Sequence, residues 1–180
     1  LIGSSLVVVV GLCTGLVAYY NGSAPTGAAA RLPELAYLPS DASAVAYADV
    51  KDIMASEFRQ RLRESLPTGA EKDRLLAETG IDIEHDIDSV VAGLNHDAPS
   101  PHNAVVLFRG RFDTARIEAL ATEHGAVTEQ YKGKKILLAP PSVSAAPGSA
   151  APAIAFLEPG LLALGSQADL HAAIDAPSAP

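Results

Sequence analysis

The stretch LFRGRFDTARIEAL, residues 107–120, decides the predicted fold, because it combines a strand, a turn and the start of a helix. Asp113 is the expected N-cap of that helix, since its carboxylate can accept hydrogen bonds from the free backbone N–H groups of the first turn. A second stretch, LALGSQADLHAAI (residues 162–174), has the same order of strand, glycine, cap and helix, with Ser166 as the expected cap.

Other strands and helices are predicted outward from these two stretches. Apolar runs predict strands at residues 44–50, 89–94, 104–109, 127–131, 135–139, 153–157 and 161–164, the first of them as a buried strand. Helical spacing predicts helices at residues 52–66 and 71–79 in addition to the two capped helices. This order predicts an α+β fold: a ferredoxin-like (split β-α-β) domain with an antiparallel or mixed sheet, an added hairpin and a C-terminal helix. The helices are expected to pack on one face of the sheet.

The N-terminal run LIGSSLVVVVGLCTGLVAYY, residues 1–20, has no charged residue and is long enough to cross a bilayer as a helix. It is longer than the apolar core of a cleaved signal peptide. A lipoprotein would use Cys13, but Leu12 is large for the position before a lipidated cysteine. A buried core helix is the third alternative. The run therefore predicts a single transmembrane helix, followed by a flexible linker (21–33), an α+β domain (34–176) and a tail (177–180).

Two features of this run refine the prediction. Gly11 and Gly15 have the GxxxG spacing that lets membrane helices approach closely, so they are candidate helix-packing residues. No basic residue lies within ten positions after the run, which favours an extracytoplasmic domain under the positive-inside rule. The expected protein is a single-pass membrane protein with a periplasmic domain.

Composition excludes several classes of protein. The chain has 13 Lys and Arg against 21 Asp and Glu, a net charge of −8, so it lacks the positive surface that nucleic acid requires. A single cysteine permits no intrachain disulfide and no cysteine-rich zinc site. The sequence has no Gly-x-Ser-x-Gly motif and no Gly-rich phosphate loop, so no catalytic residue or cofactor is assigned.

The acidic stretch at residues 81–88, IDIEHDID, is the one segment whose composition could suit a metal ion. Counted from Asp82 as a calcium loop, it has Ile87 at the glycine position and Gly93 at the position of the bidentate carboxylate, so the loop pattern fails. The favoured interpretation is a solvated turn with inward isoleucines, in which Asp82 or Asp86 caps a helical turn. The histidines are scattered without metal-ligand spacing, at positions 85, 96, 102, 124 and 171.

Four phrases together resemble a group of uncharacterised, membrane-anchored bacterial envelope proteins that carry a domain of unknown function. They are LPSDASAVAYADVKDIMAS (38–56), ETGIDIEHDIDSVVAGL (78–94), LFRGRFDTARIEAL (107–120) and FLEPGLLALGSQADLHAAID (156–175). The resemblance implies an anchored α+β domain and no known activity or cofactor.

Two functions from different classes follow. The first is a non-catalytic accessory subunit of a larger bacterial membrane protein complex, such as a photosynthetic reaction centre or a respiratory assembly. Its partners would be other membrane subunits and the lipid bilayer. The alternative is a free-standing envelope binding module that recognises a ligand or peptide, for which an open strand edge would be the observable feature.

Overall fold

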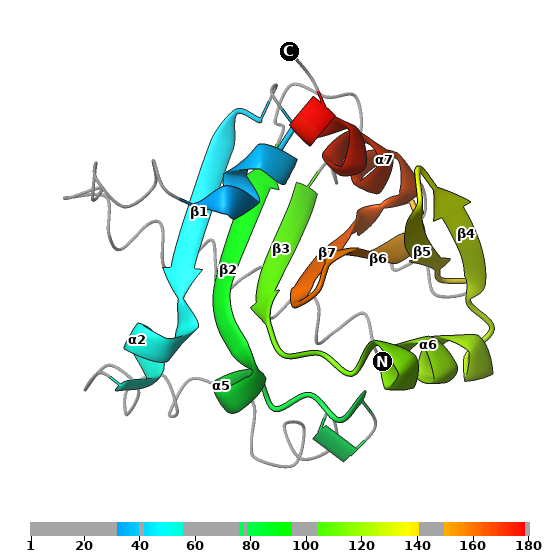
Figure 1. Ribbon diagram of the computed structural model, residues 1–180, viewed down its shortest axis with the longest axis horizontal. Coiled ribbons are helices and arrows are strands. Elements are labelled where there is room, and N and C mark those ends of the chain that lie inside the picture. Colours follow the sequence, from blue (N-terminus) through cyan, green and yellow to red (C-terminus); the bar gives the residue numbers. More distant parts are fainter. Residues whose placement is uncertain are drawn as a thin grey trace.

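The computed structural model describes residues 32–39, 42–55, 76–77, 79–94, 104–140 and 150–178. Its centre is a seven-stranded sheet with the strand order β1-β2-β3-β7-β6-β5-β4, antiparallel at every pairing (Figure 1). The strands are β1 (Ala44–Asp49), β2 (Ile87–Leu94), β3 (Ala104–Gly110), β4 (Val127–Tyr131), β5 (Lys134–Leu138), β6 (Pro152–Glu158) and β7 (Leu161–Ser166). The helices are η2 (Pro33–Tyr37), α2 (Val50–Ala55), α5 (Ile83–Asp86), α6 (Thr114–Glu123), α7 (Gln167–Asp175) and η4 (Ala176–Ser178).

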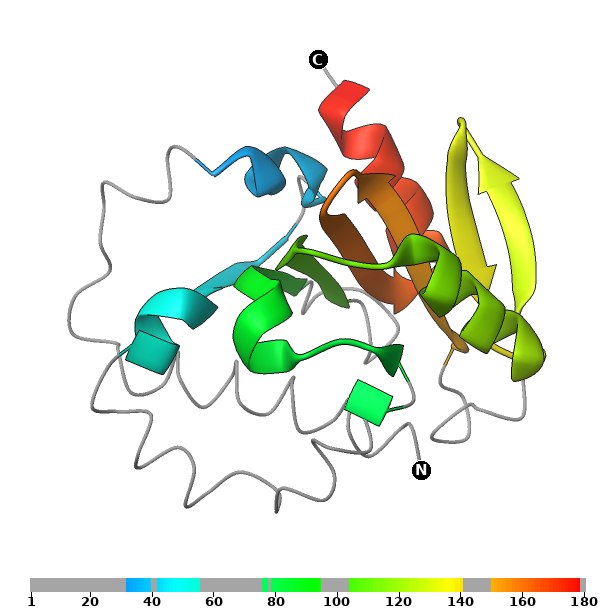
Figure 2. The same ribbon diagram turned by 60° about the horizontal axis from the view of Figure 1, so that its bottom comes forward.

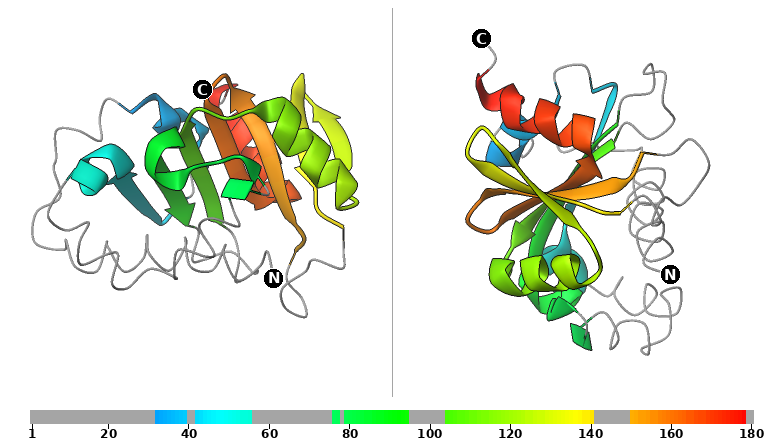
Figure 3. Two further views of the ribbon diagram at one scale, coloured as in Figure 1. Left: turned by 90° about the horizontal axis from the view of Figure 1, so that it is seen from below. Right: turned by 90° about the vertical axis from the view of Figure 1, so that its right-hand side faces the viewer.

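The sheet carries helices on both faces, with α7 on one side and α6 on the other (Figure 3). The α7 face of the sheet packs Leu107, Ile136 and Leu161 against Leu170 of α7, all of them at most 1% exposed. On the α6 face, Ile117 of α6 packs with Leu137 and Leu162. Residues of the central strands alternate between these two faces, as the pleat of a sheet requires.

N-capping side chains predicted from the sequence set the residues at which α6 and α7 begin. Asp113 Oδ1 accepts the backbone N–H of Arg116 at 3.0 Å, as the sequence predicted. Ser166 and Asp169 form a capping box at the start of α7, in which each side chain accepts the other residue's backbone N–H. The two stretches singled out in the sequence therefore do form strand, cap and helix.

The β4–β5 hairpin owes its tight turn to two residues with positive φ. Lys132 has a φ of 48° and Gly133 a φ of 77°. Positive φ at both central residues is the pattern of a type I′ turn, whose twist matches that of the flanking strands. Such a short turn makes β4 and β5 antiparallel neighbours.

The ferredoxin-like prediction is wrong. A split β-α-β unit joins two parallel strands through a helix and has another strand between them, but β1 and β2 are direct antiparallel neighbours although helical residues lie between them in the chain. Short hairpin turns join β4 to β5 and β6 to β7, and β7 pairs with β3 at the centre. The expectation that the helices share one face is also wrong, because α6 and α7 cover opposite faces (Figure 3).

The membrane prediction is corrected as well. Within the described ranges, no helix is both long and apolar enough to span a bilayer. The longest of these helices, α6, has 10 residues, which corresponds to about 15 Å, or half of a bilayer core. The predicted transmembrane helix at residues 1–20, with Gly11 and Gly15, lies outside the described residues. The single-pass topology and the periplasmic localisation are therefore not supported by the described part of the chain.

Candidate functional site

Strand β1 forms one edge of the sheet, since β2 is its single neighbour among the described strands. Tyr47 lies opposite Val91, a core residue of the α7 face, so Val45, Tyr47 and Asp49 belong to that face. α7 packs against β3, β5, β6 and β7, farther across the sheet (Figure 1). Val45 is 51% exposed and Tyr47 is 38% exposed. The predicted burial of this strand is therefore wrong.

The composition of β1 explains both the prediction and its failure. Ala44, Ala46 and Ala48 raise the apolar content of the segment, but alanine adds little surface to a core. The larger side chains, Val45 and Tyr47, share the opposite face and stay exposed, although η2 packs on the same face and its Glu34 lies close enough to act on Tyr47. Alternation of this kind is typical of a strand that is buried on one side at most.

An exposed edge presents backbone N–H and C=O groups that can pair with another strand. Natural proteins often protect such edges with lysine, proline or a bulge. β1 contains neither lysine nor proline, and its pairing with β2 runs without a register shift from Ala44 to Asp49. The edge is thus regular, and its single charged residue is the terminal Asp49.

A buried ion pair lies at the end of the sheet near β1. Glu34 of η2 is 5% exposed, and its Oε1 accepts a hydrogen bond from Arg109 Nε at 2.7 Å. Its Oε2 is buried and has no hydrogen-bond partner among the described residues. Arg109 Nη1 also lies 3.8 Å from Glu158 Oε2. These contacts fasten η2 to the ends of β3 and β6.

Burial and nearby carboxylates raise the pKa values of two tyrosines, Tyr37 and Tyr47. Burial, a 2.5 Å hydrogen bond donated to Glu158 and the negative charge of that carboxylate together raise the pKa of Tyr37 to about 12. The pKa of Tyr47 is raised by burial first, and then by Asp49, Glu34 and Asp52. Negative charge therefore gathers around the Asp49 end of β1.

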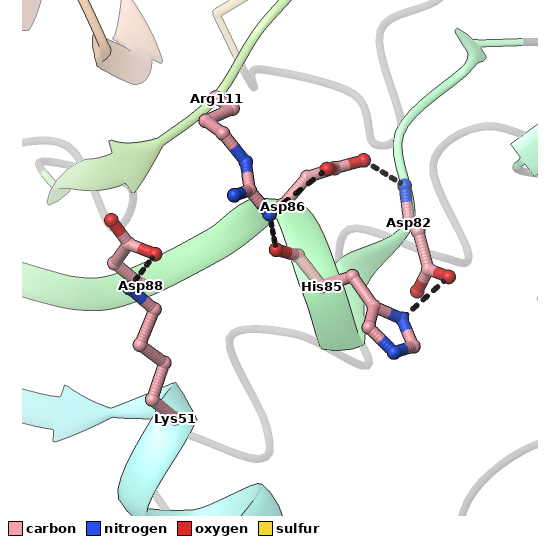
Figure 4. Close-up of polar contacts among 6 residues, drawn as sticks. All are labelled: Lys51, Asp82, His85, Asp86, Asp88 and Arg111. Atoms are coloured by element: carbon pink, nitrogen blue, oxygen red, sulfur yellow. Dashed lines mark hydrogen bonds and ion pairs between the residues drawn. The ribbon is translucent and has the colours of Figure 1, made fainter.

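The acidic stretch 81–88 forms a tethering cluster (Figure 4). Asp86 Oδ2 accepts the backbone N–H of Asp82 at 2.8 Å, and His85 Nδ1 lies 2.9 Å from Asp82 Oδ2. The Arg111 guanidinium lies 3.7 Å from Asp86 Oδ1 and donates to the backbone oxygen of His85.

The same cluster extends to α2, where Lys51 Nζ lies 2.6 Å from Asp88 Oδ1 (Figure 4). The described residues contain no group of three or more His, Cys, Asp or Glu side chains that could hold a metal ion. The carboxylates instead stabilise a turn and connect it to α2 and to the segment after β3. Figure 2 shows the ribbon of α2 beside that of α5. This arrangement agrees with the turn that the sequence favoured.

The opposite edge strand, β4, is attached to α7 through a cluster that sequence reasoning missed. The rings of Tyr131 and His171 stack with centroids 3.9 Å apart and an interplanar angle of 10°. His171 Nε2 lies 2.9 Å from Glu129 Oε1, and Tyr131 donates to Asp175 at 3.1 Å. The Asp175 hydrogen bond is the main cause of a raised Tyr131 pKa. About 40 residues separate the partners, so no local sequence pattern predicts these contacts.

Several predicted features lie outside the described residues, namely Cys13, His96 and His102. The chain matches no protein-family model, no curated protein and no solved structure. The resemblance to membrane-anchored envelope proteins stays a prediction.

Proposed function

We propose that this chain is a non-catalytic interaction module that binds an extended segment of a partner chain along the outer edge of β1, which pairs with no other described strand than β2. An accessory subunit and a binding module both require a surface at which another chain is held. The observation that supports the proposal is the regular, lysine-free and proline-free edge of β1, with Val45 and Tyr47 exposed beside it. Addition of a strand to such an edge is a general mode of peptide recognition.

The structure favours β1 over β4 as the binding edge. On β4, Glu129 and Tyr131 are engaged by α7 residues. On β1, Val45 and Tyr47 offer an uncharged surface on the α7 face. Main-chain hydrogen bonds would provide affinity, and these two side chains would select the partner's side chains.

The proposed contact also sets which side chains are expected in the partner segment. Residues opposite Val45 and Tyr47 should be apolar, β-branched or aromatic, because such cross-strand pairs stabilise a sheet. The residue opposite Asp49 should not be acidic, because like charges directly opposite each other destabilise the pairing.

A display library of random linear peptides tests the proposal. The full chain should enrich peptides that alternate apolar with small or polar residues. Binding should be lost in the double variant Val45→Lys/Tyr47→Lys and kept in Val127→Lys, which places lysine on the exposed Val127 of the other edge. Enriched peptides that bind the double variant as well as the wild type would contradict the proposal, and so would a failure to enrich any peptide.

A further inference from the structure

We propose that the segment that β1 binds is β1 of a second copy of this chain, so that two sheets join across a two-fold axis at Ala46. The inference rests on the proposed function, because it names the partner for the same edge. A two-fold axis perpendicular to the sheet gives an isologous contact, in which each copy uses the same residues. It also makes the two strands antiparallel and keeps both α7 faces on the same side.

The register centred on Ala46 is self-complementary. It places Val45 of each copy opposite Tyr47 of the other, so the two exposed side chains of the edge pair twice. Pairs of aromatic and β-branched residues are among the favourable cross-strand contacts. The remaining positions bring Ala44 opposite Ala48, and Ser43 opposite Asp49. No like charges face each other in this register.

The neighbouring register, centred on Tyr47, is less favourable. It places Val45 opposite Asp49 twice and stacks the two Tyr47 side chains on each other. An apolar residue facing a carboxylate loses the cross-strand contact and takes water away from the charge. The Ala46 register avoids both costs, so it is the one expected.

The other edge lacks this complementarity. Pairing two copies of β4 about its central residue would place Glu129 opposite Glu129. α2 directly follows β1 but packs mainly against β2 and α5, on the inner side of β1. A partner strand can therefore approach the outer side of β1 without displacing α2. β1 forms the outer margin of the described sheet (Figure 1).

Disulfide trapping in the full chain tests the register. In a Cys13→Ser background, Ala46→Cys places two thiols directly opposite each other at the axis. The matched control is Ala48→Cys, because Ala46 and Ala48 lie on the same face of β1 and are both half-buried. The two Ala48 positions would lie about 14 Å apart along the strands. Under mild oxidation, the Ala46→Cys variant should form a disulfide-linked dimer and the Ala48→Cys variant should not.

Sedimentation equilibrium measures the association itself. The wild type should be a dimer, and Tyr47→Lys should raise its dissociation constant about tenfold or more, because the substitution removes two symmetric contacts. Val127→Lys should leave the constant unchanged. Circular dichroism of each variant checks that the fold is retained.

The outcomes separate this inference from the proposed function. The second-copy inference is overturned if the wild type stays monomeric, or if the Ala46→Cys and Ala48→Cys variants form disulfide-linked dimers equally. If the edge nevertheless binds library peptides in a manner sensitive to Val45 and Tyr47, the proposed function stands. A dimer that Tyr47→Lys leaves intact and Val127→Lys dissociates would overturn the inference by assigning the contact to β4.

Discussion

Glu34 and Arg109 show how single residues far apart in the sequence determine the stability of one end of this fold. Their side chains meet at 2.7 Å, with Glu34 almost completely buried. A buried charge is costly unless it is paired, so each partner depends on the other. The sequence contains no sign of this contact, because 75 residues separate the two and no local pattern links them.

Glu34→Ala is expected to lower the free energy of unfolding by about 3 kcal/mol, since it removes one partner of a buried ion pair. The control is Lys51→Ala, which breaks the 2.6 Å pair with Asp88 at a site where the lysine side chain is 63% exposed. That variant should change the stability by less than about 0.5 kcal/mol. Urea unfolding followed by circular dichroism measures both values. Equal effects of Glu34→Ala and Lys51→Ala would contradict the burial of the Glu34–Arg109 pair.

Tyr37 should make the protein less stable at high pH. Its pKa is about 12 in the folded protein, above the ordinary value of 10.0 for a tyrosine. The unfolded chain therefore loses the phenolic proton first as pH rises, and the stabilising contribution is complete below about pH 10 and lost by about pH 12. Tyr37→Phe should reduce the pH dependence of stability in that window.

Ultraviolet titration of tyrosinate checks the assignment directly. The component that titrates near pH 12 should disappear in Tyr37→Phe and persist in Tyr131→Phe. The pKa of Tyr131 is also raised, chiefly by its hydrogen bond to Asp175, so that variant controls for a general effect of losing a tyrosine.

Among the helices and strands, local chemistry was predictable and burial was not. Asp113 and Ser166 cap their helices as the sequence indicated, because an N-cap depends on atoms within three residues. The seven strands lie within two residues of the predicted ranges. The burial of β1 was mispredicted because apolar composition does not distinguish a central strand from an edge strand whose neighbour is missing.

Two adjacent alanines of α7 test how this helix packs. Ala173 is completely buried in the core of the α7 face, whereas Ala172 is exposed. Ala173→Leu should therefore destabilise the fold by about 2 kcal/mol through overpacking. Ala172→Leu makes the same chemical change and should alter stability by less than about 0.5 kcal/mol. Thermal unfolding of both variants measures the difference, and a reversed order would place α7 in a different rotation on the sheet.

For the whole molecule, short turns in the sequence predicted which strands are neighbours in the sheet, and long connections did not. The turns at residues 132–133 and 159–160 join strands that are necessarily antiparallel neighbours. The β3–β7 pairing at the centre of the sheet and the return of β2 beside β1 depend on contacts between distant segments. The interaction edge follows from that strand order, so it could not be located before the topology was known.

Native-state hydrogen exchange tests the topology and the self-association in one experiment. Amides of β3 and β7 should exchange most slowly, because these strands are central and paired on both sides. The edge strands β1 and β4 should exchange faster at low protein concentration. As concentration rises, pairing of two copies should slow exchange in β1, because association stabilises the bound state by mass action. β4 acts as the internal control and should show no concentration dependence. Protection that increases in β4 instead, or in neither edge, would show that the outer side of β1 is not where two copies meet.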